Sequence, residues 1–299
     1  MTFKNFPFNI IYSLIDKNFT RPNQYISIWK YLIYTTICKQ MIKNQNIDKE
    51  ITNQLTKIFP ITDKNNNLSR LIETYTIKDF GFQIMSSGVN ISREKVKTEI
   101  SWIEAIDIFE DTIRNYIDDA KYYIVFDELD EDYKEFRDEQ ERTNYFDMLT
   151  GLFKAIQDVR YLFEDQNKNI FPIVFLRTDI YNQITYSDKN KWSDSIINII
   201  WTPDKLKELI RHRLNILCGT KSLSFDECWR QIFGSGKLGY GLRKYKSMSS
   251  FEYILRSTQN RPRDFIKYFQ ECAKQALNSN ALLVTPKLVR EADNEFSEY

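Results

Sequence analysis

Two short apolar runs separated by a long amphipathic stretch constrain the fold of this chain most strongly. Residues 122–126 and 171–176 are rich in β-branched and aromatic side chains, without alternation of polar and apolar positions. Such runs are typical of strands that are buried on both faces of a parallel sheet. Between them, residues 141–163 place apolar side chains at helical spacing, and a third apolar run follows at residues 196–200. This order predicts a parallel sheet with right-handed crossovers.

The remainder of the chain is predicted to be mainly helical. Before the sheet, residues 23–43 and 101–118 each gather large apolar side chains on one helical face. In the second of these helices, the side chains of Phe109 and Ile113 are expected to point inward. The sheet is therefore expected to lie against amphipathic helices contributed by residues far apart in the sequence.

Helix signals alone follow the third apolar run. Proline occupies the first helical position of segments that begin at Pro203, Pro262 and Pro286, where its missing N–H would have no helical partner in any case. We therefore predict an α/β core over residues 1–200 and an all-helical subdomain over residues 201–299.

Composition excludes several classes of function. Of the 299 residues, 42% are hydrophobic and the formal net charge is +1, so charge gives no argument for nucleic acid or an anionic membrane as partner. The single histidine, His212, lies between two arginines, a poor place for a general base. One histidine and four scattered cysteines do not make a metal cage. With no signal peptide or membrane-spanning run, we expect a cytoplasmic location.

The strongest chemical motif is the carboxylate pair that ends the first run. Asp127 and Glu128 directly follow the apolar residues 124–126, which is the Walker B pattern. A carboxylate at the carboxyl end of a buried strand can hold Mg²⁺, and the next one can orient an attacking water. The alternative is a strand that simply leaves the sheet into an acidic loop. The motif alone leaves both interpretations open.

Two cationic segments are candidate partners for this pair. Arg177 ends the second run, where nucleotide hydrolases place a sensor of the γ-phosphate; alternatively, it pairs with Asp179 or with the acidic loop. Arg261 and Arg263 flank Pro262 at a predicted helix start, where they could touch nucleotide phosphates as lid arginines. The alternative there is an ordinary capped surface helix.

A third segment imitates a phosphate-binding loop. Gly234-Ser-Gly-Lys237 contains a Gly-Lys pair, but Gln231 stands where the pattern requires glycine, and Leu238 where it requires Ser or Thr. Because no buried strand precedes it either, we interpret it as a flexible loop between helices.

The segments 123–134, 175–180 and 261–264 together resemble a prokaryotic P-loop ATPase family of the AAA/STAND type, associated with mobile and antiviral-defence loci. The resemblance implies a parallel-sheet NTPase core and a helical lid. It also implies Asp127 as the Mg²⁺ ligand and Glu128 as the catalytic carboxylate, with Arg177 as first sensor and Arg263 as lid sensor. It further implies ATP and Mg²⁺ as cofactors, in a bacterial defence or regulatory protein.

The sequence departs from that family in one respect: it contains no Gly-x-x-x-x-Gly-Lys-Ser/Thr loop. That loop supplies the backbone N–H groups and the lysine that hold the phosphates. We therefore expect a fragment whose N-terminal strand and loop are missing, and which is inactive alone. Two alternatives are a nucleotide-independent scaffold domain and a DNA-handling AAA-type ATPase. A homo-oligomer or a fused effector module is the expected partner.

Overall fold

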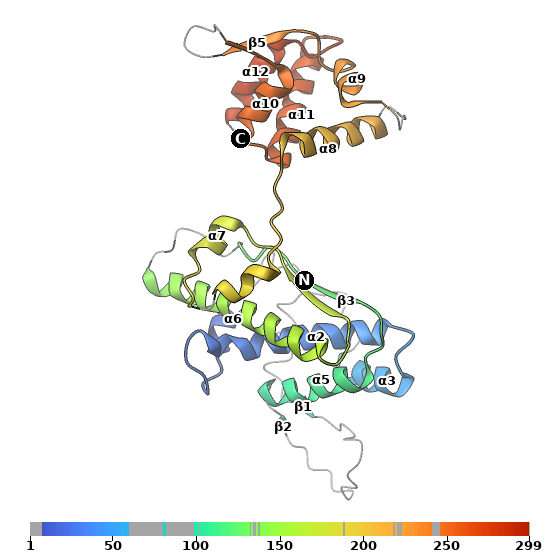
Figure 1. Cartoon of the computed structure of the whole chain (residues 1–299), viewed down its shortest axis with the longest axis vertical. Coiled ribbons are helices and arrows are strands. Elements are labelled where there is room, and N and C mark those ends of the chain that lie inside the picture. Colours follow the sequence, from blue (N-terminus) through green and yellow to red (C-terminus); the bar gives the residue numbers. More distant parts are fainter. Residues whose placement is uncertain are drawn as a thin grey trace, which may run out of the picture. The chain divides into compact units, whose positions relative to one another are not determined.

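The computed structural model describes residues 8–59, 80–81, 99–100, 102–131, 133, 136, 138–187, 189–217, 219, 223–240 and 246–298. The chain forms two compact units, Met1–Ser195 and Ile196–Tyr299 (Figure 1). The sequence placed the domain boundary after residue 200, inside the link that follows the first unit. In the described residues, no helix is long and apolar enough to cross a membrane.

The N-terminal unit is mostly helical. Its elements in chain order are α1 (Phe8–Ser13), η1 (Asn23–Tyr25), α2 (Ile26–Lys43), α3 (Lys49–Ile58), β1 (Phe80–Gly81), β2 (Glu99–Ile100), α5 (Trp102–Tyr116), β3 (Tyr122–Phe126), α6 (Glu139–Glu164), β4 (Ile170–Val174), α7 (Thr178–Gln183) and η2 (Lys189–Ser195). The helices predicted before and within the sheet region are present, and Phe109 and Ile113 of α5 are buried as expected.

The central feature of this unit is the parallel pair β3 and β4, joined through α6. Tyr122 lies opposite Ile170 and Phe126 opposite Val174. This confirms the predicted parallel pairing and its helical crossover. The P-loop core sheet is not evident, however: in the described residues, the only other pairing of this unit is the two-residue antiparallel ladder of β1 and β2.

In the described part of the chain, the parallel pair is fully buried on one face only, which corrects the prediction. Phe126 is fully buried and its ring meets that of Trp29 in α2 edge-on at 5.9 Å. On the opposite face, Tyr123 keeps 52% of its surface exposed and Phe171 keeps 39%. The prediction of burial on both faces failed because the side chains of a covered sheet face and of an exposed one can be equally apolar. Only the tertiary contacts distinguish them.

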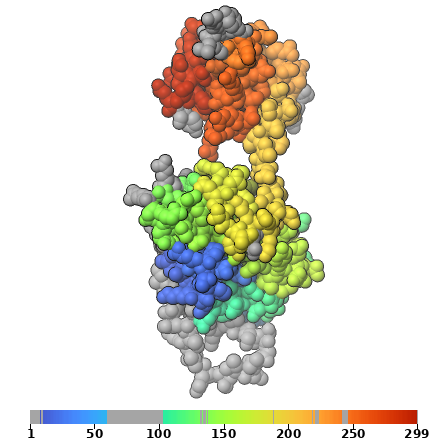
Figure 2. Space-filling model, turned by 60° about the vertical axis from the view of Figure 1, so that its left-hand side comes forward, coloured from blue at the N-terminus to red at the C-terminus, as the bar shows by residue number. Residues whose placement is uncertain are grey.

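Two helices form the covered side. α2 is apolar around most of its circumference because it is enclosed by the sheet and by α5 and α6. α6 begins at Asp138, whose carboxylate accepts the N–H of Glu141, and Gly151 in its middle allows it to approach Tyr25 closely. Arg21 reaches Asp147 at 3.8 Å. Figure 2 shows this early segment (blue) beside the start of α6 (light green).

The third apolar run is not a strand, which is a second correction. Residues 196–200 adopt neither helix nor strand, and Ile197 and Ile199 keep 88% and 69% of their surfaces exposed. A strand requires a hydrogen-bonded neighbour, and the described sheet residues offer none to this segment. Its apolar composition therefore predicted a strand where the structure has an exposed link.

The C-terminal unit contains the predicted helices and an unpredicted hairpin. Its elements are α8 (Pro203–Leu217), α9 (Phe225–Arg230), β5 (Lys237–Tyr240), β6 (Lys246–Ser249), α10 (Ser250–Ser257), α11 (Pro262–Asn278) and α12 (Pro286–Ser297). β5 and β6 pair antiparallel, so the all-helical prediction was wrong for this stretch. Its core includes a stack of Trp229 on Phe233 with ring centroids 4.0 Å apart.

Candidate acidic site at the end of the parallel pair

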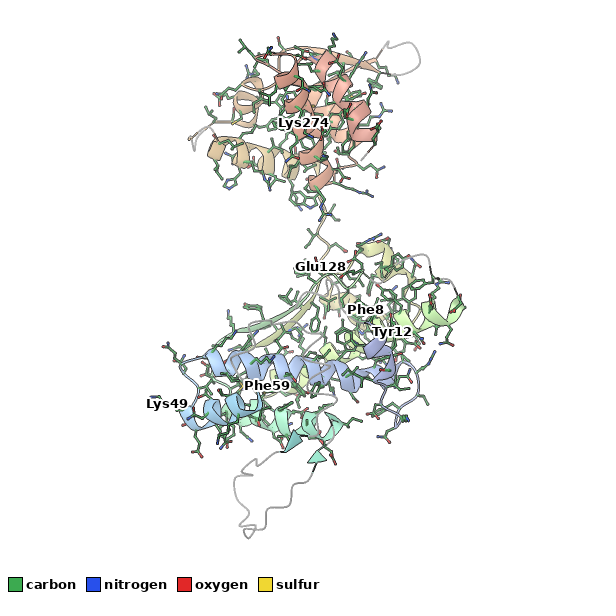
Figure 3. All side chains as sticks on the ribbon, turned by 180° about the vertical axis from the view of Figure 1, so that it is seen from behind. Phe8, Tyr12, Lys49, Phe59, Glu128 and Lys274 are labelled. Atoms are coloured by element: carbon green, nitrogen blue, oxygen red, sulfur yellow. The ribbon has the colours of Figure 1, made fainter. Side chains whose placement is uncertain are left out.

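The predicted carboxylates and Arg177 follow the same end of neighbouring strands. Phe175 donates its N–H to the carbonyl of Phe126 at 2.8 Å, which continues the pairing to the last residue of β3. Asp127 and Glu128 come directly after that residue, and Arg177 follows Phe175 by two positions. Figure 3 labels Glu128 where β3 ends. The structure thus brings three of the five predicted site residues to one edge of the sheet.

The backbone turns sharply at the carboxylate pair. Glu128 has φ of 62°, a left-handed conformation that is uncommon outside glycine. Its N–H donates to Asp127 Oδ1 at 2.9 Å, and its carbonyl accepts the N–H of Glu131 at 3.3 Å. The next residue, Leu129, is fully buried, and its carbonyl accepts the hydroxyl of Tyr145 from α6. The turn is therefore anchored to the core directly beside Glu128, while Asp127 is exposed.

Arg177 is engaged by carboxylates in this structure. Its Nε and Nη2 donate to Asp179 at 3.1 and 2.6 Å, and its Nη1 lies 3.7 Å from Asp130 Oδ2. Its guanidinium also lies 5.8 Å from the ring centre of Tyr133. The hydrogen bonds from Arg177 lower the pKa of Asp179, and the same bonds raise the pKa of Arg177. The pairing alternative is thus realised, and it joins the end of β4 to the acidic loop after β3.

The residues present fit a divalent cation better than a triphosphate. Mg²⁺ needs only one or two protein carboxylates when water and phosphate complete its shell, and Asp127, exposed at the end of the strand, could supply one of them. The described residues contain no group of three or more His, Cys, Asp or Glu that could hold a metal by themselves. Among the described residues that follow the two strands, Arg177 is the cation available to a triphosphate, and it stands among carboxylates that repel phosphate.

The predicted lid arginines lie in the other unit. Arg261 precedes α11, whose first residue is Pro262 as predicted, and its guanidinium lies 3.9 Å from Asp264. Arg263 is exposed in the first turn of the helix. This local arrangement matches the capped surface helix that the sequence offered as the alternative. Both arginines are exposed, and Asp264 already places a negative charge in the first turn of the helix.

The loop that imitates a Walker A motif is packed rather than flexible. The N–H of Gly234 donates to the carbonyl of Val284 at 3.0 Å, and a Cβ on Gly236 would stand 2.7 Å from Pro286 Cγ. Lys237 then opens β5, so the segment leads into a strand, whereas a phosphate-binding loop leads into a helix.

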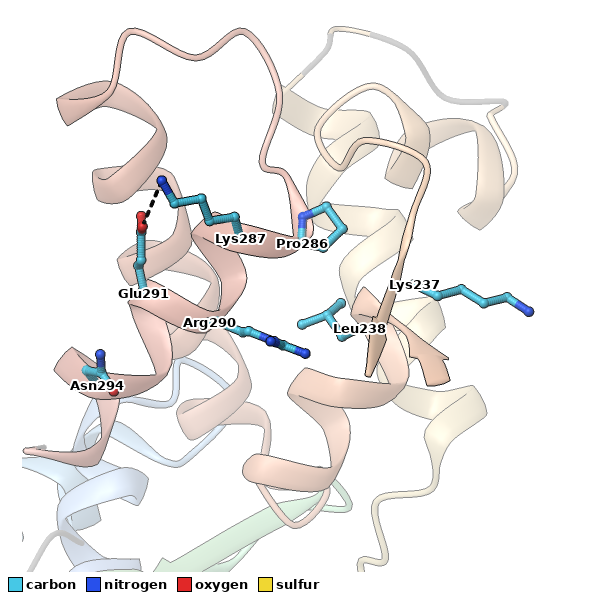
Figure 4. Close-up of a pocket in the computed structure, with 7 residues that line it drawn as sticks. All are labelled: Lys237, Leu238, Pro286, Lys287, Arg290, Glu291 and Asn294. Carbon is cyan, nitrogen blue, oxygen red and sulfur yellow. Dashed lines mark ion pairs between the residues drawn. The ribbon is translucent and has the colours of Figure 1, made fainter. Parts of the chain in front are cut away.

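A shallow pocket of about 420 Å³ adjoins this loop. Seven residues line it: Lys237, Leu238, Pro286, Lys287, Arg290, Glu291 and Asn294 (Figure 4). Two of its cations already have partners, because Arg290 donates to the carbonyl of Gly239 and Lys287 pairs with Glu291. The Lys237 side chain extends away from the other side chains drawn. The pocket therefore does not form a convergent anion site.

The sequence offered pairing of Arg177 with the acidic loop as an alternative, and the structure identifies Asp130 as the loop residue that it contacts. The signal available was the parallel pairing itself, which aligns the two strand ends.

Comparison with known proteins identifies only the C-terminal part. Residues 204–299, about a third of the chain, match a family described as the FunZ-associated C-terminal helical domain. No curated protein matches the chain, and no solved structure does. The C-terminal unit is accordingly similar to that helical domain.

Proposed function

We propose that the N-terminal unit is the acidic half of a P-loop ATPase site, with Asp127 as the Mg²⁺ ligand and Glu128 as the carboxylate that polarises water. The observation that carries this proposal is the parallel pairing of β3 and β4. It sets the carboxylate pair and Arg177 at the carboxyl end of adjacent strands, which is where open α/β sheets bind ligands.

Among the described residues, the carboxylates at this end of the strands leave the site without the positive charge that a phosphate requires. Bound Mg²⁺ would supply positive charge that neutralises phosphate oxygens and developing negative charge. Asp127 would hold such a cation, and the anchored turn fixes the backbone from which Glu128 projects. The phosphate cradle must come from another polypeptide segment, so the chain alone does not hydrolyse ATP. In the complete module, the nucleotide state would set a conformational switch.

Metal binding tests the first half of this proposal directly. Mn²⁺, a spectroscopic substitute for Mg²⁺, is titrated into the whole chain and its free fraction is followed by electron paramagnetic resonance. We expect weak binding that Asp127→Asn removes. Glu139→Gln, which deletes an exposed carboxylate in the first turn of α6, serves as the matched control. Equal Mn²⁺ affinity for Asp127→Asn and the parent chain would contradict the assignment of the ligand.

ATP turnover tests the second half. Phosphate release from Mg·ATP is measured for the parent chain and for Glu128→Gln. We expect no release above the buffer rate in either case. Turnover by the parent that Glu128→Gln abolishes would confirm the role of Glu128 but overturn the proposal that the site is incomplete.

A second candidate is a nucleotide-independent interaction domain that uses the same scaffold. It is favoured by the state of Arg177, whose donors are directed to Asp179 and Asp130. If Mn²⁺ binding proves independent of Asp127, this second candidate takes precedence.

A further inference from the structure

The uncovered face of the parallel pair is an apolar surface. Tyr123, Phe171, Ile173 and Phe175 keep 52%, 39%, 37% and 45% of their surfaces exposed. The rings of Tyr123 and Phe171 stack with centroids 5.3 Å apart, which makes the surface continuous across the two strands. Parallel sheets occur almost only where both faces are covered. In the part of the chain that the structure describes, nothing else covers this face, which we call the bare sheet face, and we therefore expect it to have an occupant.

The same chain carries a second uncovered apolar element of matching length. We call residues 196–201 the apolar link. Their sequence is Ile-Ile-Asn-Ile-Ile-Trp, with no charge, proline or glycine. Ile197, Ile199 and Ile200 are exposed at 88%, 69% and 63%. Soluble proteins interrupt such segments with charges or proline unless the segment has a partner. A link of ordinary function between two units would not need this composition.

We propose that the apolar link of one copy docks on the bare sheet face of a second copy, and that the exchange is reciprocal. Both surfaces are apolar, both are about one short strand long, and both are present in equal number in every molecule. A two-fold symmetric exchange covers the apolar link and the bare sheet face of both copies, and it closes the assembly as a dimer.

The area of the exchange is sufficient for a stable dimer. With aromatic side chains presenting about 150–250 Å² each, the exposed fractions give roughly 350 Å² on the bare sheet face. Covering it with a similar area of the link buries about 700 Å², and the reciprocal pair about 1,400 Å², within the range of specific interfaces.

The link is expected to pack on the face of the sheet and not to extend its edge at β4. Because the N–H of Phe175 points to β3, the alternation along the strand directs the nitrogen of Pro172 to the outer edge of β4. Proline has no N–H to donate there, so an added strand would lose a ladder hydrogen bond.

The oligomeric state of the whole chain tests this proposal. By sedimentation equilibrium, we expect a dimer that the variant Ile197→Lys/Ile199→Lys and the variant Phe171→Ser/Ile173→Thr each convert to monomer. Each lost apolar contact should raise the dissociation constant about tenfold or more. Leu282→Lys, at a leucine that is 100% exposed in the C-terminal unit, should leave the dimer intact. A monomeric parent chain, or dimers in both double variants, would overturn the proposal.

Disulfide trapping identifies the contact itself. Ile173→Cys and Ile197→Cys are made separately in a Cys218→Ser background, because Cys38, Cys228 and Cys272 are buried. On mild oxidation, we expect covalent dimer from a mixture of the two variants and little from either variant alone. Equal yields from the single variants and the mixture, or no dimer in any sample, would refute the reciprocal contact. Circular dichroism confirms that each variant is folded.

Discussion

Replacing Gly151 by alanine should destabilise the N-terminal unit, although the same change normally stabilises a helix. Gly151 lies in the middle of α6, where alanine gains about 1 kcal/mol over glycine. Here the added Cβ would stand 2.7 Å from Tyr25 Cβ and 3.2 Å from the Tyr25 carbonyl carbon. Favourable carbon contacts begin at about 3.5 Å, so either η1 or α6 must move.

The cost of that movement exceeds the gain in helix propensity. Tyr25 is 1% exposed, and the nearest atoms are its backbone and Cβ, which cannot rotate away. Forcing a methyl group into a packed interior costs about 1–3 kcal/mol. We expect Gly151→Ala to lower the free energy of unfolding by about 1 kcal/mol, and Gly151→Val, which adds two further methyl groups, by about 3 kcal/mol. Ala155→Gly, one turn later and also buried, loses helix propensity together with a buried methyl group, so its cost of about 1 kcal/mol or more sets an upper limit on the propensity term.

Two native thiols allow the two units to be followed separately. Cys38 is buried in α2 and Cys272 in α11. Burial raises the pKa of both thiols, to about 12 for Cys272, so that alkylation reports opening of each unit. Pulsed alkylation across a urea series, followed by peptide mass spectrometry, gives a midpoint for each.

Gly151→Ala should lower the midpoint at Cys38 and leave that at Cys272 unchanged. A Cys38 midpoint at or above that of the parent chain would refute the close approach of α6 to η1.

Three further changes have expected outcomes in the same assay. Glu128→Gly should raise the stability of the N-terminal unit by about 1 kcal/mol, because it relieves a left-handed conformation, whereas Glu128→Gln should not. Burial alone would raise the pKa of Asp118, but hydrogen bonds, the largest from the hydroxyl of Tyr122, lower it. The contribution of Asp118 to the free energy of unfolding is therefore present above the pKa of the unfolded chain and is lost as pH falls through the lower pKa of the folded state. Asp118→Asn should cost about 1 kcal/mol at neutral pH and should weaken the loss of stability at acid pH. An unchanged loss of stability at acid pH would contradict this. Ser249→Ala breaks the reciprocal cap with Glu252 and should cost the C-terminal unit about 1 kcal/mol, with no effect on the other unit.

Local signals in the sequence predicted the helices well. Proline at the first helical position marks the starts of α8, α11 and α12, because that position has no N–H to lose. The strands were predicted where they pair, but their environment was not. Tyr123 and Phe171 are as apolar as fully buried strand residues, and only the absence of a covering layer leaves them exposed.

The candidate site was predictable only to the level of its strand ends. Parallel pairing places Asp127, Glu128 and Arg177 at one edge, and the sequence pattern was enough to expect that. The ion pair of Arg177 with Asp130 depends on how the loop after β3 folds back, which no local propensity determines. Likewise, the hairpin β5–β6 escaped prediction because its strands are four residues each and lack apolar alternation.

The left-handed backbone at Glu128 bears on the choice between an acidic loop and a site. A strand that merely leaves the sheet would have no reason to keep a glutamate where glycine is less strained, since such a conformation costs about 1–2 kcal/mol. Strained residues persist where their surroundings fix them, and they concentrate at functional sites. Here the buried Leu129, whose carbonyl accepts the hydroxyl of Tyr145, fixes the turn. A left-handed glutamate held in this way at the end of a parallel strand is the kind of backbone outlier from which a functional hypothesis starts, and the Mn²⁺ titration of Asp127→Asn decides whether that function depends on a cation.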